Sequence, residues 1–471
     1  MGIRLPRGLA AFAHRDYRIF WFAQLGSLTG TWMQSLAQSW LILTMTNSPF
    51  QLGLVNVCQF GPTLLLGLPA GVVADRVPKR TLLLCTQAVA CAVTALLALS
   101  VATGRVQLWH IYAAALGLGV ANALDMPTRQ AFVADIVGRP DLMNAVALNS
   151  ALFNTTRVVG PAIAGILLAQ VGAAVCFVVN AVSYLPVLLG LLAMRTTGAP
   201  APEAAADRAS PVARLWQGFT YVRATPAVLL PIMLVGVIAT FGMNFNVWVP
   251  LLAQRSFGIG AEGFGLLMST LGVGSLAGAL LLAFRGRQPS RRWMLLTGIA
   301  FGGFEVALAL GAVFGVPVAA AMALLAACGF AMSTAMALAN TTVQRTTPDA
   351  LRGRVMSIYM TVFAGTAPVG ALLAGLTAAT FGTPTSVALG GGVTALAAIG
   401  LGVGSRRSVL GGRRPVPQLG SLPDSARPSP APASTPAPAR VVMYRRSSAS
   451  PGPPSFRLPT ADVRPSTVGD D

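Results

Sequence analysis

The sequence predicts an all-α integral membrane protein with twelve transmembrane helices in two six-helix bundles. Of its 471 residues, 54% are hydrophobic and only 10% are charged, and the mean hydropathy is +0.67. These charges are too few to cover a water-soluble domain of this size. Apolar runs of about 20 residues, enough to cross a bilayer core, recur to about residue 404. Because the runs are continuously apolar, they exclude the alternating pattern of a membrane β-barrel.

The predicted spans fall in two sets of six. The first set lies near 17–45, 50–73, 80–103, 107–133, 143–169 and 172–194, and the second near 227–253, 262–284, 293–315, 317–340, 353–380 and 384–404. The same interval separates Gly71 from Gly278 and Pro161 from Pro368, which indicates a duplicated six-helix unit. We expect an N-terminal bundle over residues 1–195 and a C-terminal bundle over residues 226–404. Glycines one turn apart also predict close helix contacts, at Gly67 with Gly71 and at Gly274 with Gly278.

Two segments lie outside the bundles. Residues 196–225 form a predicted central loop, in which "VARLWQGFTYVR" (212–223) places apolar residues at helical spacing beside arginines. This pattern predicts an amphipathic helix on the inner membrane surface. Pro, Ser, Ala and Arg dominate residues 405–471, so we expect a disordered cytoplasmic tail.

Basic residues predict how the chain crosses the membrane. With the N-terminus in the cytoplasm, most arginines fall in inner loops, and the outer loops keep essentially Arg105 and Arg255. This positive-inside asymmetry places both termini in the cytoplasm. The net charge of +19 is then mainly a topology signal. We expect membrane lipid, and no nucleic acid, as a partner of these residues.

The small number of lysine and histidine residues argues against an enzyme. Lys79 is the only lysine and lacks a Walker A glycine pattern, so we expect no ATP site. His14 and His110 are the only histidines, which excludes metal clusters and Ser-His catalysis in practice. We expect no catalytic residue, no metal and no cofactor, and therefore a secondary transporter.

Few charged residues lie well inside the predicted spans, away from their ends, where each costs about 2.5–3.5 kcal/mol at the helix centre. Asp125 and Arg129 stand four apart on one face of the fourth span, Arg157 stands in the fifth, and Glu305 in the ninth. We consider proton coupling or gating for all four. A structural salt bridge and a protonation role stay equally open for Asp125 with Arg129.

Polar and aromatic side chains in the first and seventh spans are candidates for a substrate cavity. Dispersed amides without a cluster of charges suit an amphipathic or lipophilic organic molecule better than a sugar or a phosphate. Helix packing is the alternative role of each candidate. The candidates are Gln34, Gln38, Trp40, Phe241, Asn244 and Asn246.

The segment "GVVADRVPKR" (71–80), between the second and third spans, resembles the signature G-x-x-x-D-R-x-G-R-R of the major facilitator superfamily. Pro78 stands where that family usually has glycine, and the resemblance covers residues 14–404. It implies alternating access, with Asp75 as a conformational latch that engages the start of helix 11 when the inner gate is shut. It also favours the Asp125 region for proton coupling, because helix 4 lines the cavity in this superfamily. The matching residues are Gly71, Asp75, Arg76, Lys79 and Arg80, and for the basic ones a topology role is equally open.

A narrower resemblance joins the chain to the bacterial exporter branch that contains enterobactin and macrolide efflux proteins, which are implied to be proton-driven antiporters. It lies in "GTWMQSLAQSWLILTMTNSPFQLGLV", "ALDMPTRQAFVADIV" and "LWQGFTYVRATP". "RVVGPAIAG" also partly resembles the antiporter motif of helix 5, with Gly160, Pro161 and Gly165 matching. The upstream glycines of that motif are replaced here, and a simple Gly-Pro kink is the alternative.

Together these features predict a proton-coupled antiporter that exports a small amphipathic or lipophilic molecule, such as a drug, a siderophore or another secondary metabolite. We expect it to be a monomer in the inner membrane of a bacterium, with protons, the small molecule and lipid as its partners. Two alternatives stay open: uptake by the same fold, and a membrane sensor or assembly partner that acts through residues 405–471 without transport.

Overall fold

A computed structural model describes residues 7–199, 211–285 and 290–410. These residues fall within one compact unit, which spans Met1–Arg427, whereas a second unit, Pro428–Asp471, lies outside them. All regular elements of the described part are helices. The N-terminal ones are the 3₁₀ helix η1 (Arg7–Ala13), α1 (Arg15–Thr46), α2 (Pro49–Arg76), α3 (Lys79–Ala102), α4 (Leu108–Gln170) and α5 (Ala173–Ala193).

The C-terminal elements begin with the short helix α6 (Pro211–Ala224). A helix is therefore present over the predicted residues 212–223, and it packs on α12. Its place on the inner membrane surface stays a prediction. A broken span follows, made of α7 (Pro226–Val237), the π-helix η3 (Ile238–Gly242), α8 (Phe245–Leu251) and the π-helix η4 (Leu252–Ser256). The remaining helices are α9 (Ala261–Arg285), α10 (Arg291–Phe314), α11 (Val318–Thr346), α12 (Asp349–Gly365), α13 (Ala367–Phe381) and α14 (Thr383–Leu410).

The predicted count of twelve spans is not confirmed. In the described ranges nine helices are long and apolar enough to cross a membrane, or ten if the bent α2 is one span. One difference lies in α4, whose 63 residues carry two predicted spans. Gly138 divides them, since its φ of 71° is left-handed and lies outside the helical region. The other difference is α1, which is rich in Gln, Ser and Thr and is not among the nine.

Two predicted segments extend beyond what the structure describes. Helix α14 continues to Leu410, so the last helix runs six residues beyond the predicted boundary at 404. The rest of the predicted tail, 411–471, lies outside the described residues, as do residues 200–210 of the predicted central loop.

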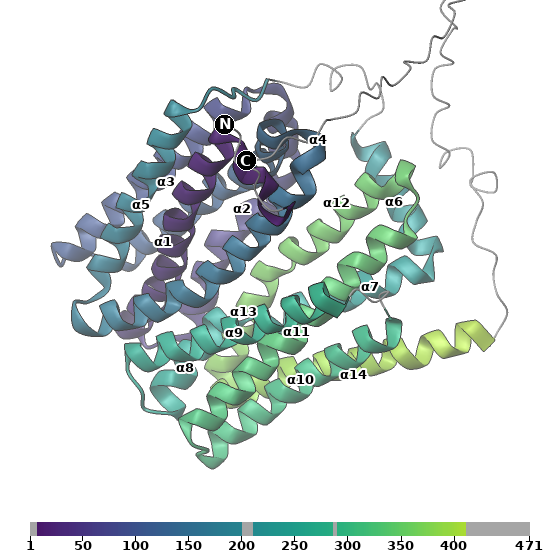
Figure 1. Cartoon of the computed structure of the whole chain (residues 1–471). Coiled ribbons are helices and arrows are strands. Elements are labelled where there is room, and N and C mark those ends of the chain that lie inside the picture. Colours follow the sequence, from purple (N-terminus) through teal and green to yellow (C-terminus); the bar gives the residue numbers. More distant parts are fainter. Residues whose placement is uncertain (1–6, 200–210, 286–289, 411–471) are drawn as a thin grey trace, which may run out of the picture. The chain divides into compact units, whose positions relative to one another are not determined.

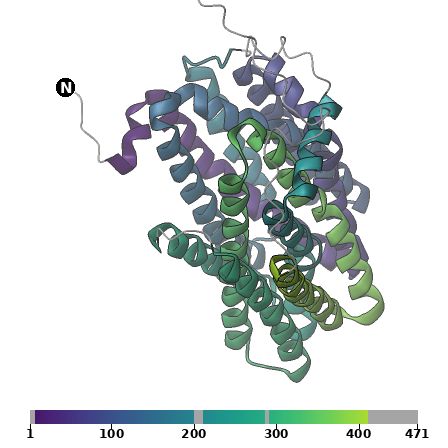
Figure 2. The ribbon, with the colours of Figure 1, turned by 90° about the vertical axis from the view of Figure 1, so that its right-hand side faces the viewer.

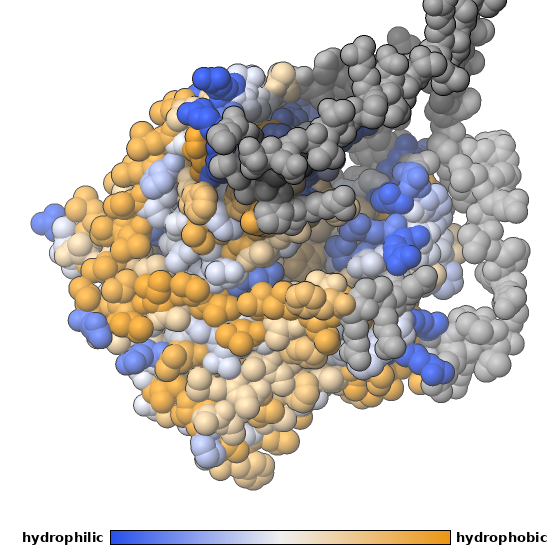
Figure 3. Space-filling model, in the orientation of Figure 1, coloured by the Kyte–Doolittle hydropathy of each residue, from blue (hydrophilic) through white to orange (hydrophobic). Residues whose placement is uncertain are grey.

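Helices that belong to the same half of the sequence pack on one another (Figure 1). In the N-terminal half, α1 and α3 each contact α4 and α5, and α2 packs on α4. In the C-terminal half, α10 packs on α11 and α14, and α9 packs on α11. The halves meet where α2 packs on α13 and α4 on α9, and Figure 2 shows the same helices from the side. Apolar residues cover much of the outward helix faces, as expected next to lipid (Figure 3).

The predicted glycine contacts hold in one half only. A Cβ added to Gly274 or Gly278 would lie 1.9 and 2.6 Å from carbonyl oxygens of α11, so these glycines let α9 and α11 touch. The prediction is wrong for Gly67 and Gly71, because nothing lies within 4 Å of their Cβ positions. The reason is local: α2 bends by 65° between Pro49–Gly67 and Pro69–Arg76, as helices do at proline.

Candidate functional site

The two halves touch through glycines at one end of the helices, which we call the Asn47 end after the residue between α1 and α2. A Cβ added to Gly165 on α4 would lie 2.8 Å from the Cα of Gly265 on α9. Beside this contact, the ring of Trp40 on α1 stacks on Phe264, with centroids 5.8 Å apart. The backbones of α4 and α9 are therefore in direct contact here.

A second contact closes the same end. A Cβ added to Gly375 on α13 would lie 3.2 Å from the Cα of Gly53 on α2. The Arg255 guanidinium after α8 donates to the backbone oxygen of Asn47 at 2.5 Å and to its side-chain oxygen at 3.0 Å. Both pairs of facing helices are thus joined at the Asn47 end.

The opposite end, which we call the Asp75 end, differs. Asp75 and Arg76 are exposed, and Asp75 makes no hydrogen bond or ion pair with any described residue. On the part of α2 that leads to Asp75, the side chain of Leu65 is 77% exposed and that of Val72 is 41% exposed. The eleventh predicted span begins with α12. The implied contact of Asp75 with the start of this helix is not made in this conformation, which leaves the latch role a prediction.

Among the basic residues of this loop, Lys79 and Arg80 are engaged. The Lys79 ammonium, 8% exposed, lies 2.9 Å from the Asp135 carboxylate and donates to the Ala199 carbonyl at 3.2 Å. Arg80 donates to the Leu192 carbonyl at 2.6 Å. These two residues tie the start of α3 to α4 and to the end of α5, which makes this loop part of the N-terminal bundle.

Asp125 lies in a closed polar cluster between α3 and α4. Arg129 donates to one carboxylate oxygen through Nε at 2.8 Å and also through Nη2. Thr86 and Gln87 donate to the other oxygen at 3.0 and 2.8 Å. The Asp125 side chain is 8% exposed, so its charge is buried but compensated by these donors. Sequence reasoning missed Thr86 and Gln87, because single polar residues in a span carry little signal alone.

Arg157 is a charged residue without a counter-charge. It stands on α4 beside α1, with its guanidinium carbon 6.0 Å from the ring centroid of Trp32. No described residue forms a salt bridge or a hydrogen bond with its side chain, which remains partly exposed. Phe153, one turn earlier, packs on the same indole at 5.7 Å. An unpaired cation at this depth marks a functional position by default.

Glu305 is unpaired too, in the other half. Its side chain on α10 is 0% exposed, and neither carboxyl oxygen has a hydrogen-bond partner among the described residues. The sequence singled out this carboxyl, but its complete burial follows from how η3, α11 and α14 pack around α10.

The predicted antiporter motif forms a packing face. A Cβ added to Gly160 would lie 2.5 Å from the Cβ of Trp32 on α1. A Cβ added to Gly265 on α9 would lie 2.7 Å from the carbonyl oxygen of Pro161 and 2.6 Å from the Cα of Gly165. The three motif residues thus let α4 approach helices of both halves.

The predicted cavity residues do not gather in one cluster. Gln34 accepts hydrogen bonds from Asn180 at 2.6 Å and Thr94 at 3.2 Å, inside the N-terminal bundle. Gln38, on the same helix, is 3% exposed. In the other half, Asn244 donates to the Thr240 carbonyl at 2.9 Å. Phe241 and Asn246 flank it and are partly exposed. Their contacts with a substrate remain a prediction.

Known proteins resemble this chain over most of its length. A profile of the family described as transmembrane secretion effectors, within the major facilitator superfamily, matches residues 7–408. The staphyloferrin A transporter of Staphylococcus aureus is 29% identical over 355 residues, which are 75% of this chain and 87% of that protein. The multidrug efflux pump Tap of Mycolicibacterium fortuitum is 28% identical over 365 residues (75% and 87%). The enterobactin exporter EntS of Shigella boydii is 29% identical over 367 residues (77% and 85%).

Solved structures show the same fold. A bacterial homologue of the human lysosomal transporter Spinster, in an inward-facing and unoccupied conformation, aligns with a TM-score of 0.61 at 16% identity, over 90% of this chain and 99% of that one. A D-xylose-proton symporter aligns with a TM-score of 0.65 at 12% identity (81% and 97%). These relatives and neighbours are membrane transporters rather than enzymes. The chain belongs to the transmembrane secretion effector family of the major facilitator superfamily.

Proposed function

We propose that this transporter exports a small amphipathic organic molecule across a bacterial inner membrane in exchange for protons. One observation carries the proposal: glycine contacts join the halves at the Asn47 end, while Asp75 at the other end is exposed and pairs with none of the described residues. A transporter that alternates access needs one end joined and the other free to open. If the Asp75 end is cytoplasmic, as the arginine distribution predicts, this is the conformation that loads cargo from the cell.

Arg157 refines the class of cargo. Its charge faces an indole and has no acidic partner among the residues described, so an acidic group of the cargo would supply the missing counter-charge. Trp32 beside it offers an aromatic surface to the apolar part of the same molecule. We therefore expect amphipathic organic anions among the preferred substrates.

Export is favoured over uptake by the relatives. Two of them carry the names of an efflux pump and an exporter, and the Gly160-Pro161 packing face matches the segment that resembles an antiporter motif. The sensor alternative rests on residues 405–471, of which 411–471 lie outside the described part. Removing residues 411–471 separates the alternatives, since a transporter keeps its flux without them and a tail-dependent sensor loses its output.

Inverted membrane vesicles provide the test. The panel is fusidate, erythromycin and iron-free enterobactin, and the vesicles contain either the transporter or no transporter. We expect energised vesicles with the transporter to accumulate at least one panel compound, and a protonophore to abolish the accumulation. Accumulation only in right-side-out vesicles would show uptake. Accumulation that survives the protonophore would contradict proton exchange.

A further inference from the structure

Glu305 is the one acidic side chain that the described C-terminal half buries completely. The other two carboxylates described there, Glu262 and Asp349, are exposed. Glu305 stands near the middle of α10, is 0% exposed, and has two carboxyl oxygens without any hydrogen-bond donor among the described residues. A polar group in this state is costly to bury, and an ionised one far more so.

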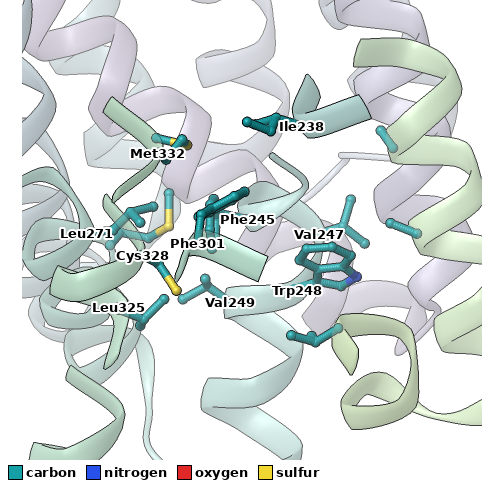
Figure 4. Packing of buried hydrophobic residues seen from close by; sticks show 14 of the residues in the cluster. Ile238, Phe245, Val247, Trp248, Val249, Leu271, Phe301, Leu325, Cys328 and Met332 are labelled. Atoms are coloured by element: carbon teal, nitrogen blue, oxygen red, sulfur yellow. The ribbon is translucent and has the colours of Figure 1, made fainter. Parts of the chain in front are cut away.

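Its surroundings are apolar and close-packed. A Cβ added to Gly391 on α14 would lie 2.7 Å from the Cβ of Glu305, so α14 covers the base of the side chain. One turn earlier on α10, Phe301 packs edge-on against Phe245, with ring centroids 6.2 Å apart. Figure 4 shows these two rings close to Cys328 of α11 within the same apolar cluster. The pocket therefore offers an ionised carboxylate no compensating group.

Few titratable groups face Glu305. Cys328 on α11 is the one that interacts with it electrostatically. Residues 226–253, 318–343 and 383–403, which supply most of the helix surface packed around α10, contain no Asp, Glu, Lys, Arg or His. Arg255 of η4, which also packs on α10, is exposed and donates to Asn47. No salt bridge can therefore hold Glu305 in its charged form in this conformation.

The carboxyl touches the point where the seventh span is broken. Its Oε2 atom lies 3.3 Å from the position that a Cβ on Gly242 would take, and Gly242 is the last residue of the π-helix η3. After Gly242 the helix stops and resumes as α8 at Phe245. π-Helical turns and broken spans are where transporter helices change shape. A shift of this break would expose the carboxyl to water.

We infer that Glu305 is the proton-binding site of the transport cycle, that it holds a proton in this conformation, and that movement of the break after Gly242 releases it. This inference rests on the proposed proton exchange. Asp125 is less suited to the same role, because Arg129, Thr86 and Gln87 already stabilise its charge without a proton. The proton binds to one carboxylate oxygen of Glu305 and leaves to water, with no other bond changed.

Infrared spectroscopy of the purified transporter in lipid tests protonation without needing a substrate. A buried protonated carboxyl gives a C=O stretching band, and the Glu305→Gln variant removes it. We expect the band in wild type at neutral pH, its loss in Glu305→Gln, and its retention in Glu262→Gln, which changes an exposed carboxylate of the same type. A wild-type spectrum that Glu305→Gln leaves unchanged would overturn the inference.

Transport by the same variants separates this inference from the proposed function. Proteoliposomes would be loaded with the panel of fusidate, erythromycin and iron-free enterobactin, with and without a pH gradient. We expect Glu305→Gln to lose gradient-driven accumulation, and Glu262→Gln, which changes an exposed carboxylate, to keep it. If wild type and Glu305→Gln both accumulate compound, the assignment of Glu305 fails and proton exchange stands. If wild type accumulates no more compound with the gradient than without it, the assignment of Glu305 and the proposed proton exchange both fail.

Discussion

Gly165 on α4 and Gly265 on α9 lie in direct backbone contact across the two halves: a Cβ added to Gly265 would lie 2.6 Å from the Cα of Gly165. Neither helix can carry a larger side chain there without moving. Since α2 and α13 meet in the same way through Gly53 and Gly375, the Asn47 end is joined by two pairs of glycines. Its opening must separate both pairs.

Replacing Gly265 tests this contact. Gly265→Ala should destabilise the joined conformation by about 1–3 kcal/mol, the usual cost of overpacking, and lower transport by at least about fivefold. The matched control is Gly303→Ala on α10, where nothing lies within 4 Å of the Cβ position. Vesicle flux per amount of folded protein is the measurement. Equal flux in both variants would show that the contact does not limit transport.

The latch prediction concerns Asp75. If its carboxylate engages the start of α12 when the Asp75 end closes, the interaction is worth about 0.3–1 kcal/mol, so Asp75→Asn should lower export by about two- to fivefold. The control is Glu262→Gln, and membrane abundance must be equal. Normal export by Asp75→Asn at that abundance would remove the latch.

The Asp125 cluster predicts a stability effect. Asp125→Ala leaves the half-buried Arg129 without its partner and should lower the free energy of unfolding by about 3–5 kcal/mol. The double variant Asp125→Ala with Arg129→Met removes the uncompensated charge and should recover part of that loss. Thermal unfolding in detergent, followed by tryptophan fluorescence, measures both. A double variant less stable than Asp125→Ala would argue against an uncompensated charge as the cause.

Arg157 should select cargo by charge. Fusidate and its methyl ester differ by one carboxylate, so Arg157→Gln should weaken transport of the acid by about tenfold and leave the ester within about twofold. Arg157→Lys keeps the charge and should retain a preference for the acid. Competition between the two compounds in vesicles gives the ratio directly. An equal loss for both compounds would assign Arg157 to helix packing.

Asp16 predicts a pH-dependent contribution to stability at the start of α1. Thr196 donates to its carboxylate through N and Oγ1, both at 2.9 Å, and the Arg195 amide donates at 3.0 Å. Partial burial raises the pKa of Asp16, but these hydrogen bonds outweigh it and hold the pKa below its ordinary value of 3.8. The folded pKa is thus lower than the unfolded one, so the stabilisation is complete above about pH 4 and is lost as pH falls through the folded pKa.

The measurement is the thermal midpoint of wild type and Asp16→Asn across that range. At neutral pH the variant should lose about 1–2 kcal/mol, because a charged acceptor becomes neutral. The two midpoints should converge in acid. A constant difference between them would show that the charge of Asp16 is not responsible.

Hydropathy and charge patterns were enough to predict the fold class, because a lipid solvent forces long apolar helices wherever the chain crosses. The family was predicted from the resemblance of residues 71–80 to a known signature. Residue spacing also placed Asp125 and Arg129 on one face of a helix, where a salt bridge between them was one of two open interpretations. It did not predict Thr86 and Gln87 as their partners, or the pairing of Gly165 with Gly265, because these contacts depend on how separate helices are placed. The prediction for Gly67 and Gly71 failed for the same kind of reason, since the bend at Pro69 turns that part of α2 away from its neighbours.

Exchange of cargo for protons by the purified protein is the central claim, and proteoliposomes with a trapped pH-sensitive dye test it most directly. Adding each panel compound, with and without an imposed pH gradient, should produce proton movement opposite to the compound, and collapsing the gradient should abolish its accumulation. Compound flux with no accompanying proton movement, in protein shown to be folded, would contradict the account.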